Sequence, residues 1–353
     1  MVFYFDITKA AGARHFSGLT RVSERLRHAI EKRWTGKFSP VIWNKKKLFF
    51  SQPGSRDPVH ISSEDCFLTP EVFSSVERPG FYEGLKESRA RCAAIFHDSI
   101  PLKHPDIIWP KSVERHPQYM EDLLEFNNVF SVSAASKEDL GNYWASLGKK
   151  ETPPLRVLQL GADFFDHSNV KWRHRPVSPP LILCIGILEP RKNQQEVLKV
   201  ACGLWKAGLQ FELHFVGRVN PHFGKPIEKE IKAIRRKGYP IHLHSKQNDE
   251  LLLDLYSKTR FTVFNSYAEG FGLPVIESLW LGIPCLCNDL PSLRGFLPQP
   301  ACQIVSNENE LTRALKSWLE NPDLIDHATL CARKLTLPQW SDAAETLIQW
   351  AKD

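Results

Sequence analysis

The stretch FTVFNSYAEGFGLPVIESLWLGIPCLCND, residues 261–289, decides the fold of this 353-residue chain. Residues 261–264 form an apolar run that predicts a buried strand, and the Gly- and Pro-rich residues 269–274 predict a turn. A helical pattern follows, with Pro274 suited to the first helical position because its missing N–H group would have no partner there. A second apolar strand begins at Ile283. Strand, turn, helix and strand in this order predict a parallel sheet covered by helices.

The turn between the first strand and the helix has the features of an anion-binding site. Gly270 and Gly272 let the backbone approach a ligand closely, and the N–H groups at the start of the helix then face the anion. Glu269 precedes the turn. Glu277 follows it early in the helix, where a carboxylate can reach ribose hydroxyls as in dinucleotide sites. An ordinary strand–turn–helix with a favourable dipole carboxylate is the alternative interpretation.

Length and composition predict a two-domain globular protein. A chain of 353 residues exceeds the usual size of a single core, while its composition, 42% hydrophobic and 24% charged, is ordinary. No apolar run approaches the roughly 20 residues that a membrane span needs. Residues 1–10, MVFYFDITKA, predict a buried first strand, since no basic region precedes a long apolar core as in a signal peptide. We therefore expect a cytoplasmic protein.

Cysteine and charge patterns narrow the class of protein further. The eight cysteines include no Cys-x-x-Cys pair, which predicts buried free thiols rather than a cysteine zinc site or a set of disulfides. The net charge of +6 is unevenly placed, with cations at Arg21, Arg25, Arg27, Lys32, Arg33, Lys37 and Lys45–Lys47. We expect no nucleic-acid partner, because no recognition motif is present. An anionic membrane surface and an ordinary solvated helix face are the interpretations that remain.

Apolar runs alternate with helical patterns along the whole chain. Strands are predicted at residues 2–6, 93–97, 128–132, 156–159, 181–187, 211–216, 241–243, 261–264 and 283–287. Helices are predicted at about residues 21–34, 111–126, 135–144, 194–207, 227–237, 249–257, 311–319 and 337–352. This alternation favours parallel, doubly wound sheets. A polar, Pro-rich run at residues 171–180 predicts a linker between two lobes.

The run of residues 269–277 resembles the Glu-x7-Glu signature of a large glycosyltransferase family. Glu269 and Glu277 match its two acidic residues, and the core Glu-Gly-Phe-Gly-Leu-Pro matches without a departure. The family comprises retaining, nucleotide-sugar-dependent glycosyltransferases (family 4, group 1 type) with the GT-B fold, in which two Rossmann-like doubly wound lobes face a cleft. The resemblance implies that Glu269 is catalytic. It also implies that the donor is bound by Gly270, Phe271, Gly272, Leu273 and Glu277.

A second segment, residues 184–193, resembles the strand-end element with which the family holds the donor diphosphate. Gly186 provides the turn after a strand, and Arg191 and Lys192 place two cations where phosphates would bind. Lys192 matches the family's diphosphate lysine, so we also expect it to take part in catalysis. Ile187 stands where the family often has an additional arginine, and Arg191 or an arginine of the first lobe would compensate.

Residues 96–101 resemble the family's His-Asp-x-Ile-Pro element. The resemblance implies that His97 is the active-site histidine that contacts the donor sugar across the cleft. The adjacent Asp98 would either orient His97 or cap the turn.

Residues 17–21 resemble a glycine-containing loop of the first lobe, which usually reads Gly-Ile-Gly-Arg. Thr20 replaces its second glycine. The resemblance implies that the Gly18 backbone N–H group approaches the donor diphosphate, with Arg21 nearby.

The resemblance is strongest after residue 181 and implies a division of the chain into domains. Residues 1–170 would form an acceptor-side Rossmann-like domain, residues 171–180 a linker, and residues 181–335 the nucleotide-sugar-binding domain. Residues 336–353 would form a helix that crosses back to the first domain.

The function implied by the resemblance is that of a retaining hexosyltransferase that needs neither a metal nor a cofactor. The sequence Glu-Pro-Arg-Lys-Asn is most like that of bacterial mannosyl- and rhamnosyltransferases of surface polysaccharide synthesis. It favours GDP-mannose as the donor, with UDP-glucose and dTDP-rhamnose left open. The acceptor would be a growing glycan, free or lipid-linked, met at the inner face of the plasma membrane. The alternatives are a non-catalytic nucleotide- or glycan-binding protein on the same scaffold and a GT-B epimerase or phosphorylase.

Overall fold

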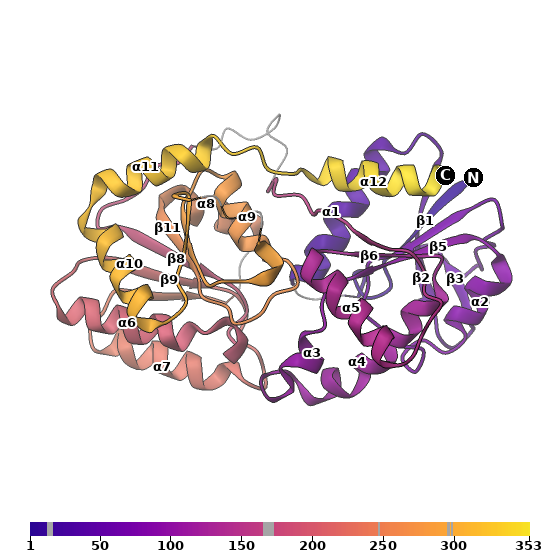
Figure 1. Cartoon of the computed structure of the whole chain (residues 1–353), viewed down its shortest axis with the longest axis horizontal. Coiled ribbons are helices and arrows are strands. Elements are labelled where there is room, and N and C mark those ends of the chain that lie inside the picture. Colours follow the sequence, from indigo (N-terminus) through magenta and orange to yellow (C-terminus); the bar gives the residue numbers. More distant parts are fainter. Residues whose placement is uncertain (13–16, 165–172, 246–247, 295–296, 298) are drawn as a thin grey trace. The chain divides into compact units, whose positions relative to one another are not determined.

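The computed structural model describes residues 1–12, 17–164, 173–245, 248–294, 297 and 299–353 (Figure 1). The chain forms two compact units, the first unit (Met1–Gly161 with Pro338–Asp353) and the second unit (Ala162–Leu337). Each is a sheet of mainly parallel strands with helices on both faces, so the predicted α/β class with two doubly wound sheets is confirmed. The division after Gly161 precedes the predicted linker, of which Lys171 and Trp172 lie outside the described residues.

The first unit contains a seven-stranded sheet with the order β3-β2-β1-β4-β5-β6-β7. Its strands are β1 (Val2–Asp6), β2 (Lys37–Asn44), β3 (Phe49–Ser51), β4 (Cys66–Thr69), β5 (Arg91–Phe96), β6 (Asn128–Ser131) and β7 (Leu155–Val157). Neighbouring strands are parallel except for the antiparallel pair β2 and β3. The strand order reverses between β1 and β4, the kind of place where open α/β sheets bind ligands.

The helices of the first unit include one from the far end of the sequence. They are α1 (Gly18–Arg33), α2 (Phe81–Ser88), α3 (Ile100–Lys103), α4 (Pro110–Asp122), α5 (Ala134–Ser146) and α12 (Trp340–Lys352), with the 3-10 turns η1 (Pro105–Ile107) and η2 (Leu123–Glu125). α12 packs beside α1 (Figure 1). Arg91 Nη1 donates to the Trp350 carbonyl oxygen at 2.7 Å, and the Trp350 ring meets Phe130 edge-on with centroids 6.0 Å apart. α12 is therefore part of the core of the first unit.

The second unit contains a six-stranded sheet with the order β10-β9-β8-β11-β12-β13. Its strands are β8 (Leu181–Ile185), β9 (Glu212–Val216), β10 (Ile241–His244), β11 (Thr259–Phe264), β12 (Cys285–Cys287) and β13 (Cys302–Ile304). Its helices are α6 (Gln194–Lys206), α7 (Gly224–Arg236), α8 (Asp249–Lys258), α9 (Leu273–Trp280), α10 (Glu308–Glu320) and α11 (Pro322–Arg333), with the 3-10 turns η3 (Pro190–Lys192) and η4 (Pro291–Leu293). Counted within the unit, the strand order is 3-2-1-4-5-6, the Rossmann order, and it reverses between β8 and β11.

The sequence predicts buried free cysteines and no membrane-spanning segment. All eight cysteines are free; six are buried and two are half-buried, as the sequence predicts. Among the described residues, none of the helices combines the length and the apolar character that crossing a bilayer requires.

Candidate functional site

The carboxyl ends of β8 and β11 meet where the strand order of the second unit reverses. Beside them, the backbone after β9 lies so close to that after β8 that a Cβ atom does not fit at Gly217. A Cβ atom on Gly217 would lie 2.0 Å from the Gly186 carbonyl oxygen. Gly272, which precedes α9, has a φ of +100°, a conformation that an L side chain rarely adopts. Both glycines are buried, and the close approach at Gly217 and the positive φ at Gly272 explain why glycine stands at these positions.

A cluster of charged side chains lies at this edge and joins residues that are far apart in the sequence. Lys192 Nζ, on the turn η3 after β8, lies 2.5 Å from Glu269 Oε1, after β11. Arg191 Nη1 lies 2.9 Å from Glu269 Oε2. One carboxylate thus holds both cations that the sequence places at the donor diphosphate. The structure brings together Lys192, Arg191 and Glu269.

The charge state of the cluster follows from its burial and its pairing. Burial by itself would raise the pKa of Glu269, but the charges of Arg191 and Lys192 outweigh it and lower the pKa to about 2. Burial lowers the pKa of Lys192, and Glu269 opposes that shift. The carboxylate is therefore ionised at neutral pH. It can stabilise positive charge but cannot serve as a proton donor.

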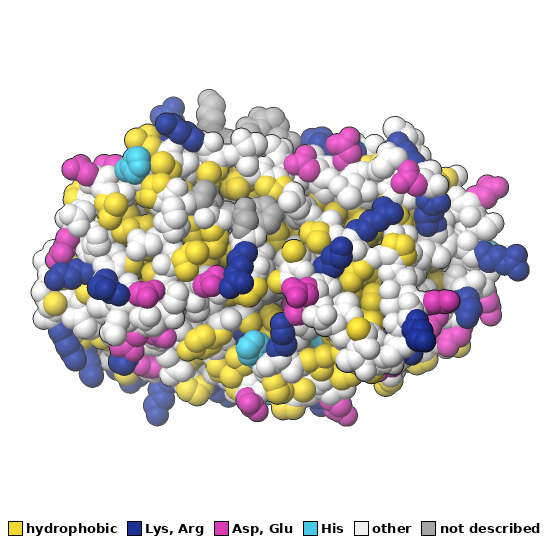
Figure 2. All heavy atoms as spheres, viewed as in Figure 1, with side chains coloured by type: hydrophobic (Ala, Val, Ile, Leu, Met, Phe, Trp, Pro, Cys, Tyr) yellow, Lys and Arg dark blue, Asp and Glu magenta, His cyan; other side chains and the backbone are white. Residues whose placement is uncertain are grey.

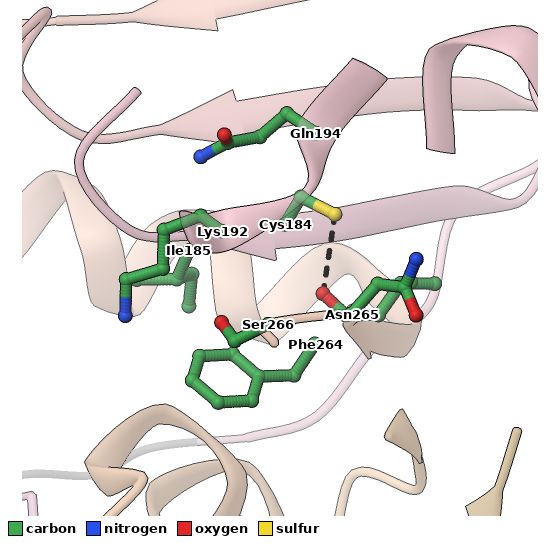
Figure 3. A pocket seen from close by; sticks show the side chains of 8 residues that line it. Cys184, Ile185, Lys192, Gln194, Phe264, Asn265 and Ser266 are labelled. Atoms are coloured by element: carbon green, nitrogen blue, oxygen red, sulfur yellow. Dashed lines mark hydrogen bonds between the residues drawn. The ribbon is translucent and has the colours of Figure 1, made fainter. Parts of the chain in front are cut away.

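A small hollow lies behind the lysine (Figure 3). Lys192 comes from the turn η3 and Gln194 from the start of α6, while Phe264 ends β11 and Asn265 and Ser266 follow it. Lys192 Nζ lies 5.0 Å from the centroid of the Phe264 ring, and Gln194 Nε2 donates to the Ile187 carbonyl oxygen at 2.8 Å. The lysine ammonium therefore lies over an aromatic face, which favours a cation.

The other residues predicted to bind the donor form the turn after β11 and the start of α9. Phe271 and Leu273 are buried, Gly270 is buried beside them, and Pro274 is the second helical residue. Glu277 is the fifth residue of α9 and is only 4% exposed. The ribose contact of Glu277 stays a prediction.

The predicted sugar-contacting histidine belongs to the first unit, directly after β5, whereas the charged cluster belongs to the second. His97 is 5% exposed, and its Nε2–H group donates to the Pro70 carbonyl oxygen at 2.7 Å. Burial lowers the pKa of His97, so its ring is neutral at pH 7 with Nδ1 as the acceptor nitrogen. Asp98 caps the following turn, since its Oδ1 accepts from the Ile100 N–H group at 3.0 Å.

The neutral state of His97 predicts a pH-dependent contribution to stability. The unfolded chain takes up a proton on this ring near the ordinary histidine pKa of about 6.5, whereas the folded chain does so only at lower pH. The contribution of His97 to the free energy of unfolding therefore falls as the pH drops below about 6.5. The amide of His97→Gln can still donate to Pro70 but does not titrate. Urea unfolding measures the free energy of unfolding at about pH 7.5 and about pH 5.5. The decrease between the two pH values should be smaller in this variant than in the wild type. An equal loss in the variant and in an exposed control, His60→Gln, would contradict the assignment.

The Gly18 segment begins a helix where the sequence predicts a loop. Gly18 is the first residue of α1 and Ser17 is its N-cap. The Thr20 N–H group donates to Ser17 Oγ at 3.2 Å, and the Ser17 N–H group donates to Thr20 Oγ1 at 2.7 Å. This capping box gives a physical reason for threonine at the family's second glycine. Arg21 is then the fourth residue of α1, and its contact with the diphosphate, like that of Gly18, stays a prediction.

Two charged networks were missed at the sequence level. In the second unit, Glu189 lies 2.8 Å from Arg191 Nη2 and accepts from Asn220 Nδ2 at 3.0 Å. Glu189 stands inside the same Glu-Pro-Arg-Lys-Asn run as Arg191, so the segment itself contained the signal.

The second missed network, which we call the Arg78 network, is buried in the first unit. Arg78 Nη1 lies 2.6 Å from Asp6 Oδ2, and Arg78 Nη2 contacts Glu71 Oε2. Glu71 also accepts the backbone N–H groups of Lys9, at 2.7 Å, and Ala10, at 2.9 Å. The network thus fixes the chain just after β1. A charged residue, Asp6, ending an otherwise apolar strand was its only sequence signal.

The second unit matches a known protein family, and the chain is similar to known mannosyltransferases. Residues 168–334 match the family described as glycosyl transferases group 1. The chain is 24% identical over 315 residues to the serotype-specific mannosyltransferase WbdA of Escherichia coli, covering 84% of this chain and 38% of that protein. It is 32% identical over 231 residues to the O-antigen chain mannosyltransferase B of Escherichia coli, covering 61% of this chain and 57% of that protein. The chain therefore spans only about two fifths to three fifths of the length of these relatives.

The fold is shared with a solved structure of the same architecture. Sucrose-phosphate synthase from Thermosynechococcus elongatus superposes with a TM-score of 0.72 at 16% identity, covering 99% of this chain and 98% of that one. The fold is the GT-B fold, as the sequence predicts. The second unit thus matches the glycosyl transferases group 1 over nearly all of its length, and the chain is similar to O-antigen mannosyltransferases.

Proposed function

We propose that the chain is a retaining glycosyltransferase that moves mannose from GDP-mannose to a hydroxyl of a growing polysaccharide or glycolipid. The observation that carries this proposal is the ionised Glu269 carboxylate held between Lys192 and Arg191 at the reversal of the strand order. Such a cluster offers cations for a diphosphate and a carboxylate for a sugar within one site.

The proposed chemistry follows the movement of charge. As the anomeric C–O bond breaks, negative charge builds on the diphosphate, and Lys192, Arg191 and the N–H groups at the start of α9 would stabilise it. The diphosphate would replace Glu269 at Lys192, and the released carboxylate would then contact the sugar hydroxyls and support an oxocarbenium-like state. The acceptor hydroxyl would attack the same face, guided by the departing phosphate, so that the anomeric configuration is retained.

The donor and acceptor are proposed from the relatives and from the sequence of the donor segment. Both relatives are named mannosyltransferases, and one is named for the O-antigen chain, which supports mannose and a surface polysaccharide. The segment of residues 189–193 supports GDP as the nucleotide.

We propose that transfer needs no metal, so activity should persist after the protein is dialysed against EDTA.

A screen of nucleotide sugars tests this function. GDP-mannose, UDP-glucose and dTDP-rhamnose are each incubated with and without glycan acceptors, the released nucleoside diphosphate is measured, and the product linkage is examined by NMR. We expect release from GDP-mannose only when an acceptor is present, and an α-anomer in the product. An epimerase would change the sugar without joining it to the glycan, and a binding protein would release nothing. Absence of release from every donor with any acceptor would refute the proposal.

Replacing Lys192 by Ala should weaken binding of GDP and abolish measurable transfer. A hydrogen bond to a charged group contributes about 1.5–3 kcal/mol, which corresponds to a 10- to 150-fold loss of affinity. Calorimetry with GDP measures the change directly. Lys199→Ala is the matched control, because Lys199 lies on α6, its side chain is 69% exposed, and its partner is the surface residue Glu308. Unchanged GDP affinity in Lys192→Ala would remove this residue from the diphosphate site.

We also propose weak contact with an anionic membrane through the basic N-terminal region. Arg27 on α1 pairs with Glu31 at 2.9 Å, and basic and acidic side chains are interspersed over the face shown in Figure 2. The exposed turn Lys45–Lys47 therefore carries more of the proposal than the helix does. Each cation near an anionic leaflet is worth about 1 kcal/mol, so binding should be salt-sensitive. At low salt, the wild-type protein should float with anionic vesicles, whereas the variant with all three lysines replaced by serine should not. Equal flotation of the two proteins would contradict the contact.

A further inference from the structure

The edge strand β10 and its neighbour β9 carry three histidines and a glutamate that the proposed function does not use. β9 and β10 pair in parallel, with His214 directly opposite His242. Glu212 lies two residues before His214, and His244 two residues after His242. Because side chains two apart on a strand share a face, all four lie on the face of the sheet that also carries the buried Val216. We propose that Glu212, His214 and His242 bind a divalent transition-metal ion of the zinc type.

The spacing of the three side chains suits one ion. A ligand atom from each of Glu212, His214 and His242 lies within 4.8 Å of the other two. Zinc bonds to nitrogen and oxygen are about 2.0–2.2 Å long, so tetrahedral ligand atoms stand roughly 3.3 Å apart. The Glu212 side chain is 34% exposed and His242 is half-buried, so small rotations of these two side chains close the gap onto the buried His214.

The fourth side chain, His244, has the position of an outer-shell partner. In the structure His214 Nε2 lies 3.0 Å from Glu212 Oε2, and His214 Nδ1 lies 3.1 Å from His244 Nε2. An ion bound at Nε2 would take the place of the proton shared with Glu212, and Nδ1–H would then donate to His244. A metal-binding histidine usually donates its second N–H group in this way, which fixes the orientation of its ring.

The chemistry of these ligands selects the class of ion. Two imidazoles with one carboxylate suit zinc and other first-row transition ions, whereas calcium and magnesium prefer oxygen ligands alone. Three protein ligands leave one position for water. Because the ligands come from two neighbouring strands, the ion would clamp the edge strand β10 to β9. None of these residues belongs to the set proposed to bind the donor, so the ion would stabilise the unit without taking part in sugar transfer.

The test measures zinc binding to the whole chain, without a histidine tag and after removal of metals by a chelator. Calorimetry with zinc chloride should give one ion per chain, and zinc should raise the melting temperature where the same concentration of magnesium or calcium does not. Glu212→Gln and His242→Asn should each weaken zinc binding at least about 10-fold and remove the thermal shift. Both variants alter partly exposed side chains, so both are expected to fold. His60→Asn, which replaces an exposed histidine of the first unit, should bind zinc as the wild type does.

Cobalt identifies the ligands, because the eight free thiols are the competing metal-binding groups. The cobalt-loaded protein should show the visible bands of a tetrahedral ion without the near-ultraviolet charge-transfer band of a thiolate. The inference is overturned if the wild type binds no zinc, if the two variants bind as tightly as the wild type, or if the thiolate band appears. Glycosyl transfer can fail or succeed independently of each of these results.

Discussion

Replacing Glu269 by Gln is expected to lower kcat about 100- to 1000-fold, the size of effect seen when one preorganised electrostatic contact to a transition state is removed. The pKa of Glu269 is lowered to about 2 by its two cationic neighbours, so the wild-type group is a full negative charge throughout the working pH range. Gln preserves the shape of the side chain but cannot support positive charge on the sugar.

The same substitution should leave GDP binding as tight as in the wild type or tighter. Glu269 pairs with Lys192 and Arg191, so a diphosphate bound to these two cations would have to displace it. Initial-rate kinetics and GDP calorimetry on the same preparation separate the two effects. Glu320→Gln is the control, since its side chain is 49% exposed on α10. If kcat and GDP affinity fell together, Glu269 would act by holding the donor site in shape and not by stabilising the transition state.

Replacing Arg78 by Met is expected to destabilise the first unit by about 3–5 kcal/mol, because it leaves two buried carboxylates without their counter-charge. Arg78 is 4% exposed and is the cation shared by Asp6 and Glu71. Its guanidinium also lies 3.7 Å from the centroid of the Phe73 ring, so packing is lost together with charge. Urea unfolding measures the free energy of unfolding of the wild type, of this variant and of the control Arg156→Met, which replaces an exposed arginine.

The loss of stability caused by Arg78→Met should grow as the pH rises. Burial, with repulsion from Asp6, raises the pKa of Glu71 to about 7 even though Arg78 opposes the shift. A carboxyl group with a raised pKa holds its proton in the folded state after the unfolded chain has lost it, so its contribution to stability declines as the pH rises above the ordinary value of about 4.3. Removing Arg78 strengthens that decline. A loss independent of pH between about 5 and 8 would show that packing, and not charge, dominates.

Much of the fold was predictable because its strands are continuous apolar runs separated by amphipathic helices. The strand Val2–Asp6 was placed without error, and the other eight predicted strands each correspond to an observed one. β2 was missed because Pro40 interrupts its alternating pattern and argues against a strand, although it pairs with Phe5 at the interior of the sheet. β3, β4 and β13, of three or four residues each, were also missed.

The candidate site was predictable as a set of residues but not as a set of contacts. The sequence pattern identifies Lys192 and Glu269, yet 77 positions separate them, and no local rule predicts that they pair with each other. The same holds for His97, whose partner Pro70 is 27 residues away. Contacts of this kind depend on which strand ends meet, and that is decided by the order of the strands in each sheet.

The position of α12 has a consequence for how the chain folds during synthesis. The first unit is discontinuous: its sheet is complete by residue 161, but the helix that covers α1 is translated only after the whole second unit. While the second unit is synthesised and folds, the face of α1 that α12 later covers therefore stays exposed to solvent. Closing the first unit also means closing a loop as long as the second unit, a cost in chain entropy that grows only slowly with length. We therefore expect the second unit to fold independently, and the first unit to reach its final stability last, although it begins first.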